Sequence, residues 1–285
     1  GATLGLVAPL PQAEVLRGEG KGEVQEVFAW EDRAFAQLAS GEWPDESPIA
    51  ERLLTYDAAI AYTANASVVA GLRRRIPVVL SHAPALLEPG THASITLAGP
   101  ALALGGAGDV EPPVLQTRVE DRAVVDEWRQ RLGGHGFLAV HPGSGSRLKN
   151  WPGPRFAEWA DALAPGRPLL VVEGPADTDA VGPLRSRAAA VFARGLPLRT
   201  LGAILAEASL YVGNDSGVSH LAAACGARTL ALFGPTDATV WAPVGPRVRV
   251  VEAPARDLNR LDTAAVVAAA RDALRSWGPA ALPSG

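Results

Sequence analysis

One stretch of the chain, residues 209–226, holds an apolar run, a tight polar turn and a helical pattern in direct succession. It reads SLYVGNDSGVSHLAAACG. The apolar residues stop at Gly213, the small polar residues Asp215 and Ser216 follow, and Gly217 opens the helical spacing. A strand–turn–helix unit presents polar side chains and backbone N–H groups at the carboxyl end of a strand, where ligands of open α/β sheets lie. The alternative is that Asp215 and Ser216 only cap the helix.

Three further apolar runs in the second half of the chain also end in polar, glycine-rich turns. These turns read HPGSGSRLKNW (141–151), EGPAD (173–177) and GPTD (234–237). Apolar runs alternate with helical patterns, which predicts an α/β fold with a doubly wound parallel sheet. Because parallel strands end at the same edge of a sheet, we expect the four turns to lie together and to share one ligand.

The alternation forms two blocks, separated by the breaker-rich segment GGAGDVEPP at 105–113. We expect two domains, residues 1–115 and 116–285. The strands expected are 3–7, 24–29, 57–62, 76–80, 137–140, 169–172, 210–212, 228–233 and 248–251. The helices expected are 31–39, 49–54, 67–72, 92–104 (bent or split at Pro100), 119–132, one from 154, 198–208, one from 217 and 263–277. In the helix at 119–132, Ala123, Val124 and Trp128 share one side.

Composition excludes several classes of protein. Apolar residues make up 48% and charged residues 20%, so a packed core is expected. A net charge of −4 does not indicate the overall basic charge that is typical of nucleic-acid-binding proteins. The single cysteine, Cys225, forms neither an internal disulfide nor a cysteine metal cluster and fits a cytoplasmic setting. Neither a long apolar run nor a signal-peptide pattern is present, so we predict no membrane span and no secretion signal.

The turn at 141–151 has the residues of a phosphate cradle. Gly143 allows close backbone approach, Ser144 offers a hydroxyl and Lys149 supplies a positive charge. The turn is not a Walker P-loop, because Lys149 is not followed by Ser or Thr, and Leu148 breaks the dinucleotide fingerprint. The alternative is an ordinary glycine turn with a solvated lysine.

Two other residues, Asp177 and His220, are candidate ligand contacts, and each also has a purely structural explanation. Asp177 can accept hydrogen bonds from both ribose hydroxyls, or it can cap the next helix. His220 can donate to a phosphate or a sugar hydroxyl, although by itself it is more typical of a half-buried histidine. No G-x-S-x-G motif and no metal-spaced cluster appears. The basic run 73–75 fits a helix C-terminus better than an anionic acceptor or a membrane surface.

Taken together, the motifs resemble those of the ADP-heptose heptosyltransferase family (glycosyltransferase family 9). The segments that carry the resemblance are HPGSGSRLKNWP, RFAEWADAL, VVEGPADTDAV, SLYVGNDSGVSHLAAACG and TLALFGPTDATVWAP. They span about residues 137–243; before them only the order of strands and helices matches. The resemblance implies a GT-B fold of two facing Rossmann-like domains with an interdomain cleft. The N-terminal domain would bind the acceptor and the C-terminal one the nucleotide-sugar, with the final helix packing back on the first domain.

The resemblance also assigns roles. It implies an inverting, metal-independent transfer of a heptose-like sugar to a glycan or lipid-linked acceptor, with an ADP-sugar donor and no cofactor. It implies a cytoplasmic protein, peripheral at the inner face of the membrane. The donor-binding residues would be Gly143, Ser144 and Lys149 at the diphosphate, Asp177 at the ribose, the segment around Leu198 at the base, Asp215 at sugar hydroxyls, and Ser216, Gly217 and His220 at phosphates or sugar.

The start of the chain departs from the family. There, the first strand ends in a Gly-Asp loop whose aspartate is the expected catalytic base. The opening GATLGLVAPL matches the second strand better, so we expect the first strand and helix of the domain to be missing here and assign no base. A GT-B sugar-nucleotide epimerase and a non-catalytic nucleotide-sugar-binding protein stay open as alternatives, and a dinucleotide oxidoreductase is the least supported.

Overall fold

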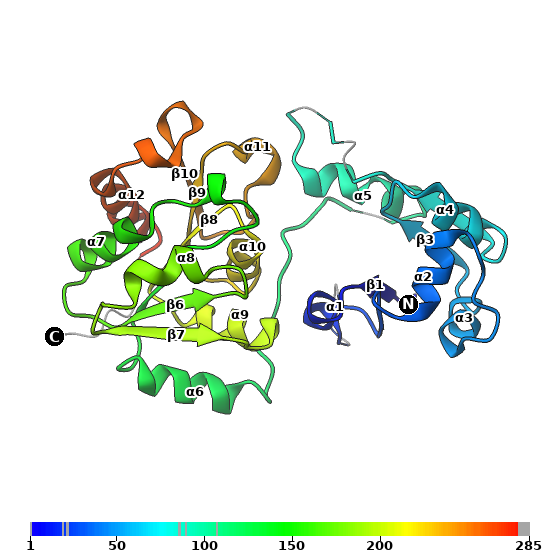
Figure 1. Cartoon of the computed structure of the whole chain (residues 1–285), viewed down its shortest axis with the longest axis horizontal. Helices are drawn as coiled ribbons and strands as arrows, with labels where there is room; N and C mark the ends of the chain where they lie inside the picture. The colour runs from blue at the N-terminus through cyan, green and yellow to red at the C-terminus, as the bar shows by residue number, and fades with distance from the viewer. Residues whose placement is uncertain are drawn as a thin grey trace. The chain divides into compact units, whose positions relative to one another are not determined.

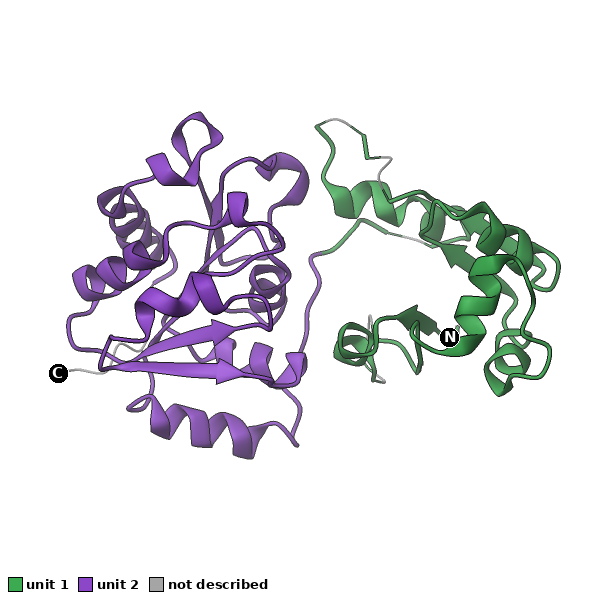
Figure 2. Ribbon diagram, in the orientation of Figure 1, with its two compact units in different colours: residues 1–111 green, residues 112–285 purple. Residues whose placement is uncertain are grey.

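The structure is a computed structural model of the 285-residue chain. It describes residues 2–18, 20, 23–84, 87–88, 90–106 and 108–278. The chain divides into two compact units, residues 1–111 and 112–285 (Figure 2). The division falls within the breaker-rich segment 105–113, because glycines and prolines support few packing contacts on either side.

The second unit is built around a six-stranded parallel sheet (Figure 1). Its order is β10-β9-β8-β5-β6-β7, so the chain reverses the direction in which the sheet grows between β5 and β8. The doubly wound parallel sheet predicted from the sequence is confirmed in this unit. The strands are β5 (Leu138–His141), β6 (Leu169–Glu173), β7 (Ala190–Arg194), β8 (Leu210–Asn214), β9 (Thr229–Phe233) and β10 (Val248–Glu252).

One strand, β7, was missed by the sequence analysis. It lies at the edge of the sheet, pairs only with β6 in the described structure, and is mostly half-buried. The apolar run at 188–193 reads AAAVFA, and four of its six residues are alanine, which is depleted in strands, so the run gives a weak strand signal.

Helices cover both faces of the sheet. On one face α7 and α12 pack Phe156, Trp159 and Val266 against alternate strand residues such as Val140 and Val212. Helix α12 packs on α7, and its expected contact with the first domain stays a prediction. The helices are α6 (Arg122–Arg131), α7 (Gly153–Leu163), α8 (Thr178–Val181), α9 (Leu198–Ala206), α10 (Gly217–Ala224), α11 (Ala238–Trp241) and α12 (Thr263–Ser276), with 3₁₀ turns η1 (Arg147–Lys149), η2 (Gly182–Leu184), η3 (Pro254–Arg256) and η4 (Leu258–Arg260).

The buried side of α6 differs from the prediction. Ala123 and Val124 are exposed, while Val125 and Trp128 are buried. Both valines lie at helical spacing from Trp128, so periodicity alone does not choose between them. A buried polar contact decides the rotation, because the Thr200 hydroxyl of α9 donates to the Asp121 carboxylate at 2.6 Å.

The first unit has two separate two-stranded parallel sheets in its described residues, β1-β2 and β3-β4, rather than one continuous sheet. Helix α1 was not among the expected helices; Pro9 is its N-cap residue and Pro11 lies in its first turn, where proline is tolerated. Helix α5 continues through Pro100 as a single element. The elements are β1 (Gly5–Ala8), α1 (Leu10–Leu16), β2 (Glu26–Ala29), α2 (Arg33–Ser40), α3 (Pro48–Leu53), β3 (Ala58–Ala61), α4 (Ala66–Arg73), β4 (Val78–Ser81) and α5 (Ala93–Ala103).

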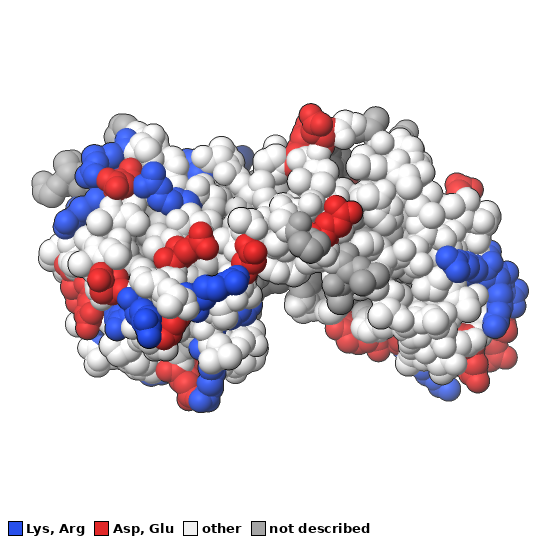
Figure 3. All heavy atoms as spheres, turned by 90° about the horizontal axis from the view of Figure 1, so that it is seen from above, with Lys and Arg blue, Asp and Glu red and all other residues white. Residues whose placement is uncertain are grey.

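The basic run at 73–75 ends α4. Arg73 lies in its last turn, and Arg75 pairs with Asp45 at 3.2 Å and lies over the Trp43 ring. These contacts fit the helix-end role favoured from the sequence. Acidic and basic side chains alternate over the face of the second unit drawn in Figure 3. Within the described ranges, no helix has the length and apolarity that crossing a membrane requires.

The orientation of α6 predicts unequal effects for two neighbouring valines. Val125→Ala removes buried methyl groups and should lower the free energy of unfolding by about 2 kcal/mol. Val124→Ala, the matched control, should change it by less than about 0.5 kcal/mol. Urea unfolding followed by circular dichroism measures both. A larger loss for Val124→Ala than for Val125→Ala would mean that α6 is rotated as the sequence pattern predicted.

Candidate functional site

The four polar turns emerge at one edge of the second sheet. The strands that precede them, β9, β8, β5 and β6, are consecutive in the sheet and parallel. The turns after β5 and β8 flank the point where the strand order reverses, which is the usual ligand position in such sheets. The shared edge predicted from the sequence is therefore confirmed.

Asn214, at the end of β8, fixes the shape of the turn after β5. Its side-chain amide donates to the Pro142 carbonyl at 2.8 Å, and its Oδ1 accepts from the Trp151 N–H at 3.0 Å. Asn214 is fully buried, so these bonds form away from water. The turn is thereby held at both ends against β8, which places Lys149 beside the turn that follows β8.

Lys149 and Asp215 form an ion pair across the switch point. The Lys149 Nζ lies 3.1 Å from Asp215 Oδ2, and the Thr236 hydroxyl donates to the same oxygen at 2.8 Å. Three of the four turns thus meet at one carboxylate. The Lys149 side chain is 24% exposed and that of Asp215 is 11% exposed, so solvent reaches the lysine more than the carboxylate. An anionic ligand at this edge would compete with Asp215 for Lys149.

The N-terminus of α10 lies at the same edge and has an open approach. The preceding residue, Ser216, makes no side-chain capping bond to the described helix, so the capping alternative is wrong for Ser216. Asp215 is instead bound to Lys149 and Thr236. Apart from its chain neighbours and the nearby backbone of α10 itself, no atom of the described chain lies within 4 Å of the position that a Cβ on Gly217 would take. Backbone N–H groups and open space at a helix N-terminus suit a phosphate or another anion.

A buried histidine, His141, bridges two further site residues. Its Nε2 lies 3.0 Å from Asp177 Oδ2, and its Nδ1 lies 3.1 Å from Ser216 Oγ. Asp177 also accepts from the Gly174 N–H at 2.7 Å and makes no capping bond to the described residues of α8, so its capping alternative is also wrong. The hydrogen bond from His141 lowers the pKa of Asp177 in spite of burial, so this carboxylate is ionised near neutral pH.

A second buried set of hydroxyls lies behind Ser216. The Ser219 hydroxyl donates to the Asn214 carbonyl at 2.6 Å and lies 3.1 Å from the Tyr211 hydroxyl, which therefore donates to it. The Ser216 and Ser219 oxygens are 3.5 Å apart. Burial raises the pKa of Tyr211 far above its usual value, so the phenol stays neutral.

Most of the predicted residues come together at this edge, including Gly143, whose missing side chain makes room for the Asp177 carboxylate. The Ser144 hydroxyl lies inside its own turn, 2.6 Å from Asn150 Oδ1. Leu198 opens α9 after β7 and is half-buried. His220 lies in the first turn of α10 and is exposed, which corrects the expectation of a half-buried histidine.

The sequence analysis gave no role to several residues that build the site. They are His141, Tyr211, Asn214, Ser219 and Thr236. A signal existed for the first of them: His141 is a polar residue directly after a run of buried strand residues. Their partners come from different turns, so only the folded sheet reveals the contacts.

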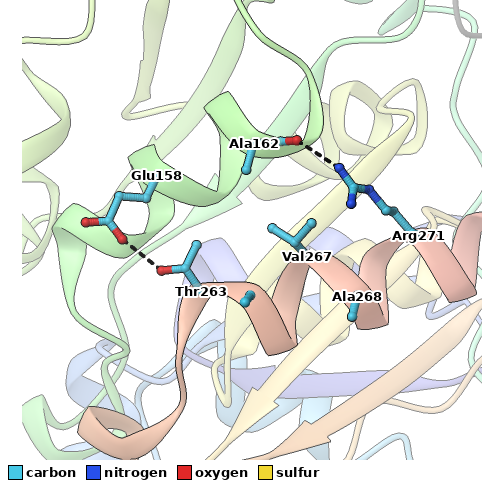
Figure 4. Close-up of a pocket in the computed structure, with 7 residues that line it drawn as sticks. Glu158, Ala162, Thr263, Val267, Ala268 and Arg271 are labelled. Atoms are coloured by element: carbon cyan, nitrogen blue, oxygen red, sulfur yellow. Dashed lines mark hydrogen bonds between the residues drawn. The ribbon is translucent and has the colours of Figure 1, made fainter.

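Two features away from the four turns add no ligand site to this edge. Among the residues that the structure describes, no three His, Cys, Asp or Glu side chains are grouped so that they could hold a metal ion. A cavity of about 430 Å³ lies between α7 and α12 (Figure 4). There Thr263 donates to Glu158, and Arg271 donates to the Ala162 carbonyl. None of the residues that line it belongs to the four turns.

Comparison with known proteins identifies the family. The sequence model of glycosyltransferase family 9 (heptosyltransferase) matches residues 55–266. This chain belongs to that family. Lipopolysaccharide heptosyltransferase 3 of Escherichia coli is 30% identical over 118 residues, which cover 39% of this chain and 34% of that protein. The chain thus matches about a third of the length of this curated relative.

Solved structures show the fold. The E. coli ADP-heptose lps heptosyltransferase II superposes with a TM-score of 0.74 at 18% identity, covering 96% of this chain and 90% of its own. The family 9 glycosyl transferase of Veillonella parvula superposes with a TM-score of 0.77 at 19% identity, covering 96% of this chain and 88% of its own. E. coli heptosyltransferase WaaC with ADP superposes with a TM-score of 0.65 at 17% identity, covering 94% of this chain and 89% of its own. The GT-B fold expected from the motifs of this family 9 chain is confirmed.

The lowered pKa of Asp177 predicts a pH-dependent contribution to stability. Its folded-state pKa lies below the unfolded value of 3.8, so the stabilisation is present above about pH 4 and is lost as the pH falls through the folded-state pKa. Asp177→Asn should lower the free energy of unfolding by about 1–3 kcal/mol at pH 7. The difference from the unmodified chain should shrink below about pH 4.

The matched control for this prediction is Asp179→Asn. Asp179 lies two residues further on and makes an exposed ion pair with Arg147, so its loss should change stability by less than about 0.5 kcal/mol at any pH. Thermal and urea unfolding between pH 3 and pH 8 measure both variants. An Asp177→Asn effect that does not vary with pH would contradict the ionised contact with His141.

Proposed function

We propose that this chain transfers a heptose-like sugar from an ADP-sugar to a glycan or lipid-linked acceptor. One observation carries the proposal: the Lys149–Asp215 ion pair lies beside the open N-terminus of α10, at the switch point of the sheet. A diphosphate and a polyol joined together fit such an edge, because it offers cationic donors next to a carboxylate. Membership of glycosyltransferase family 9 and similarity to heptosyltransferases support this choice.

Each part of the donor has a proposed partner. The diphosphate binds Lys149, Ser144 and the N–H groups at Gly217, in the turn that Gly143 opens. The sugar hydroxyls bind Asp215, with His220 and Ser216 at sugar or phosphate. The nucleobase of the donor lies against the segment around Leu198. Asp177 stays the predicted ribose contact. Its Oδ2 is bound by His141 and Gly174, so Oδ1 is the oxygen that would accept from the ribose hydroxyls.

The proposed reaction is an inverting displacement without a metal ion. The acceptor oxygen forms a bond to the anomeric carbon as the bond from that carbon to the diphosphate oxygen breaks, and the acceptor proton passes to a base that is not assigned here. Negative charge develops on the departing ADP. Lys149 and the N-terminus of α10 would stabilise that charge, since both are preorganised at the edge. Unchanged turnover in EDTA would support the metal-independent form.

The acceptor and the place of action are also proposed. The names of the curated relatives favour a lipopolysaccharide core as the acceptor. Such a substrate is made at a membrane surface, so we propose a cytoplasmic protein that works at the inner face of the membrane. Transfer of radiolabelled sugar to isolated lipopolysaccharide core is the direct assay. Release of a free sugar without an acceptor would instead indicate an epimerase.

Lys149 should dominate the binding of the diphosphate. ADP at about 100 times its Kd should stabilise the unmodified protein by about 2.7 kcal/mol. Lys149→Ala removes a charge-assisted contact and should weaken ADP binding about 10- to 100-fold. Thermal shift and calorimetry measure both quantities. Arg271→Ala, on α12 away from the four turns, is the control and should bind ADP normally. Normal ADP binding by Lys149→Ala would refute this role of the lysine.

Asp215 should contribute to the binding of the sugar but not to the binding of the nucleotide. Asp215→Asn removes the carboxylate that pairs with Lys149, so the ammonium group is released toward the ligand. We expect ADP to bind at least as tightly as before, whereas the affinity for ADP-heptose relative to ADP should fall about tenfold, from one lost charge-assisted hydrogen bond. Calorimetry with both ligands gives this ratio. An unchanged ratio would place the sugar away from Asp215.

A further inference from the structure

We propose that Thr236 is a positioning residue that holds the Asp215 carboxylate in place while Lys149 moves from that carboxylate to the diphosphate. The proposal rests on the proposed function, because it needs a diphosphate that attracts Lys149. Thr236 acts through Asp215 and not on the ligand itself. Asp215 is buried, and it receives both the ammonium group and the Thr236 hydroxyl at one oxygen, Oδ2.

The two donors divide the Asp215 carboxylate unequally. The Lys149 Nζ lies 3.1 Å from Oδ2 and the Thr236 hydroxyl donates to Oδ2 at 2.8 Å, whereas Oδ1 accepts no hydrogen bond from the described residues. A buried carboxylate that loses its donors is costly. Once Lys149 has left, the Thr236 hydroxyl is the remaining donor to Oδ2 from the described chain. Its hydrogen bond then becomes stronger, because no ammonium group neutralises the carboxylate.

The turn that carries Thr236 is held at both ends. Before the turn, the carbonyl of Phe233 at the end of β9 accepts from the Ala253 N–H at 2.8 Å. After the turn, Asp237 caps α11 by accepting from the Thr239 N–H at 2.9 Å. The threonine side chain is branched at Cβ, so a single dihedral angle places its hydroxyl. Thr236 therefore stays where the turn positions it.

Lys149 differs from Thr236 in how easily it moves. Its ammonium group is at the end of a flexible four-carbon side chain that reaches Asp215 from the 3₁₀ turn η1. The side chain is also partly exposed, so it can turn to an anionic ligand without a change in the backbone. Of the two donors to Oδ2, the lysine is therefore the one that a diphosphate removes.

The backbone of Asp215 is fixed to the same strand as Thr236. The Asp215 N–H donates to the carbonyl of Leu232 in β9 at 3.1 Å, and Thr236 follows β9 in the turn 234–237. Both the backbone of Asp215 and the hydroxyl that holds its side chain thus depend on β9. Oδ1 is left for the sugar hydroxyl that the proposed function assigns to Asp215. A carboxylate held in this way keeps one orientation toward the sugar after the lysine has left.

This arrangement predicts that Thr236→Val weakens the binding of ADP. Without the hydroxyl, Asp215 depends on Lys149 alone, so the lysine is harder to remove and the affinity for ADP should fall about three- to tenfold. The effect has the opposite sign to that of Asp215→Asn, which removes the competitor for Lys149. Valine keeps the branched shape of threonine, so the substitution removes the hydrogen bond and leaves the packing.

A double-mutant cycle with Lys149 tests the proposal. In the Lys149→Ala background there is no lysine to release, so Thr236→Val should change the affinity for ADP by less than about twofold. A purely structural role of Thr236 would lower the affinity by the same factor in both backgrounds. Calorimetry with ADP measures the four proteins. Equal losses in the two backgrounds, or no loss in either, would overturn the role of Thr236 and leave the proposed function intact.

Two further variants guard against a change in folding. Thr236→Ser keeps the hydroxyl and should bind ADP as the unmodified chain does. Thr239→Val is the matched control, because its hydroxyl donates to Asp237 at 2.7 Å at the exposed start of α11, so the affinity for ADP should not change. Equal losses in Thr236→Ser and Thr236→Val would also overturn the proposal. If the unmodified chain binds no ADP at all, the proposed function fails, and this inference fails with it.

Discussion

The imidazole of His141 joins the ends of three adjacent strands, and the arrangement of the site depends on it. His141 ends β5, Asp177 follows β6 and Ser216 follows β8. Polar groups buried at the end of an apolar sheet are costly unless each finds a partner. Here the pairing is reciprocal, so the three turns are held in one geometry before any ligand arrives. This preorganisation is what a site for a developing charge requires.

Two glycines make that geometry possible. A side chain at Gly143 would overlap the Asp177 carboxylate, and one at Gly213 would overlap the Tyr211 hydroxyl. The backbone must therefore come close at both positions, which only glycine allows. In the sequence, the glycine-rich turns predict a phosphate site. In the structure, they have a second role. They leave room for the buried groups that orient Ser216, behind the edge where the phosphate would lie.

Much of the second unit could be predicted from the sequence because its strands β5, β8 and β9 are fully buried and its turns are rich in glycine. The shared edge of the four turns follows from parallel strands alone. The bonds of Asp177 and Ser216 could not be predicted, because a capping residue and a buried partner of a histidine look alike in one dimension. The rotation of α6 was missed for a similar reason, since the contact between Asp121 and Thr200 joins distant segments. Edge strand β7 was missed because its apolar run, residues 188–193, is rich in alanine, which is depleted in strands.

The edge holds two polar systems that differ in how easily they exchange partners. His141, Asp177 and Ser216 are buried, and removing one member takes a buried hydrogen-bond partner from its neighbour, so this system is fixed. Lys149 and Asp215 are more exposed on the lysine side, where water and ions weaken the pair and a ligand can replace it. A transferase needs both kinds, because the donor must be held firmly yet the product must leave. In the proposed function, the exchangeable pair would supply affinity that can be released, and the fixed system would hold the turns in position.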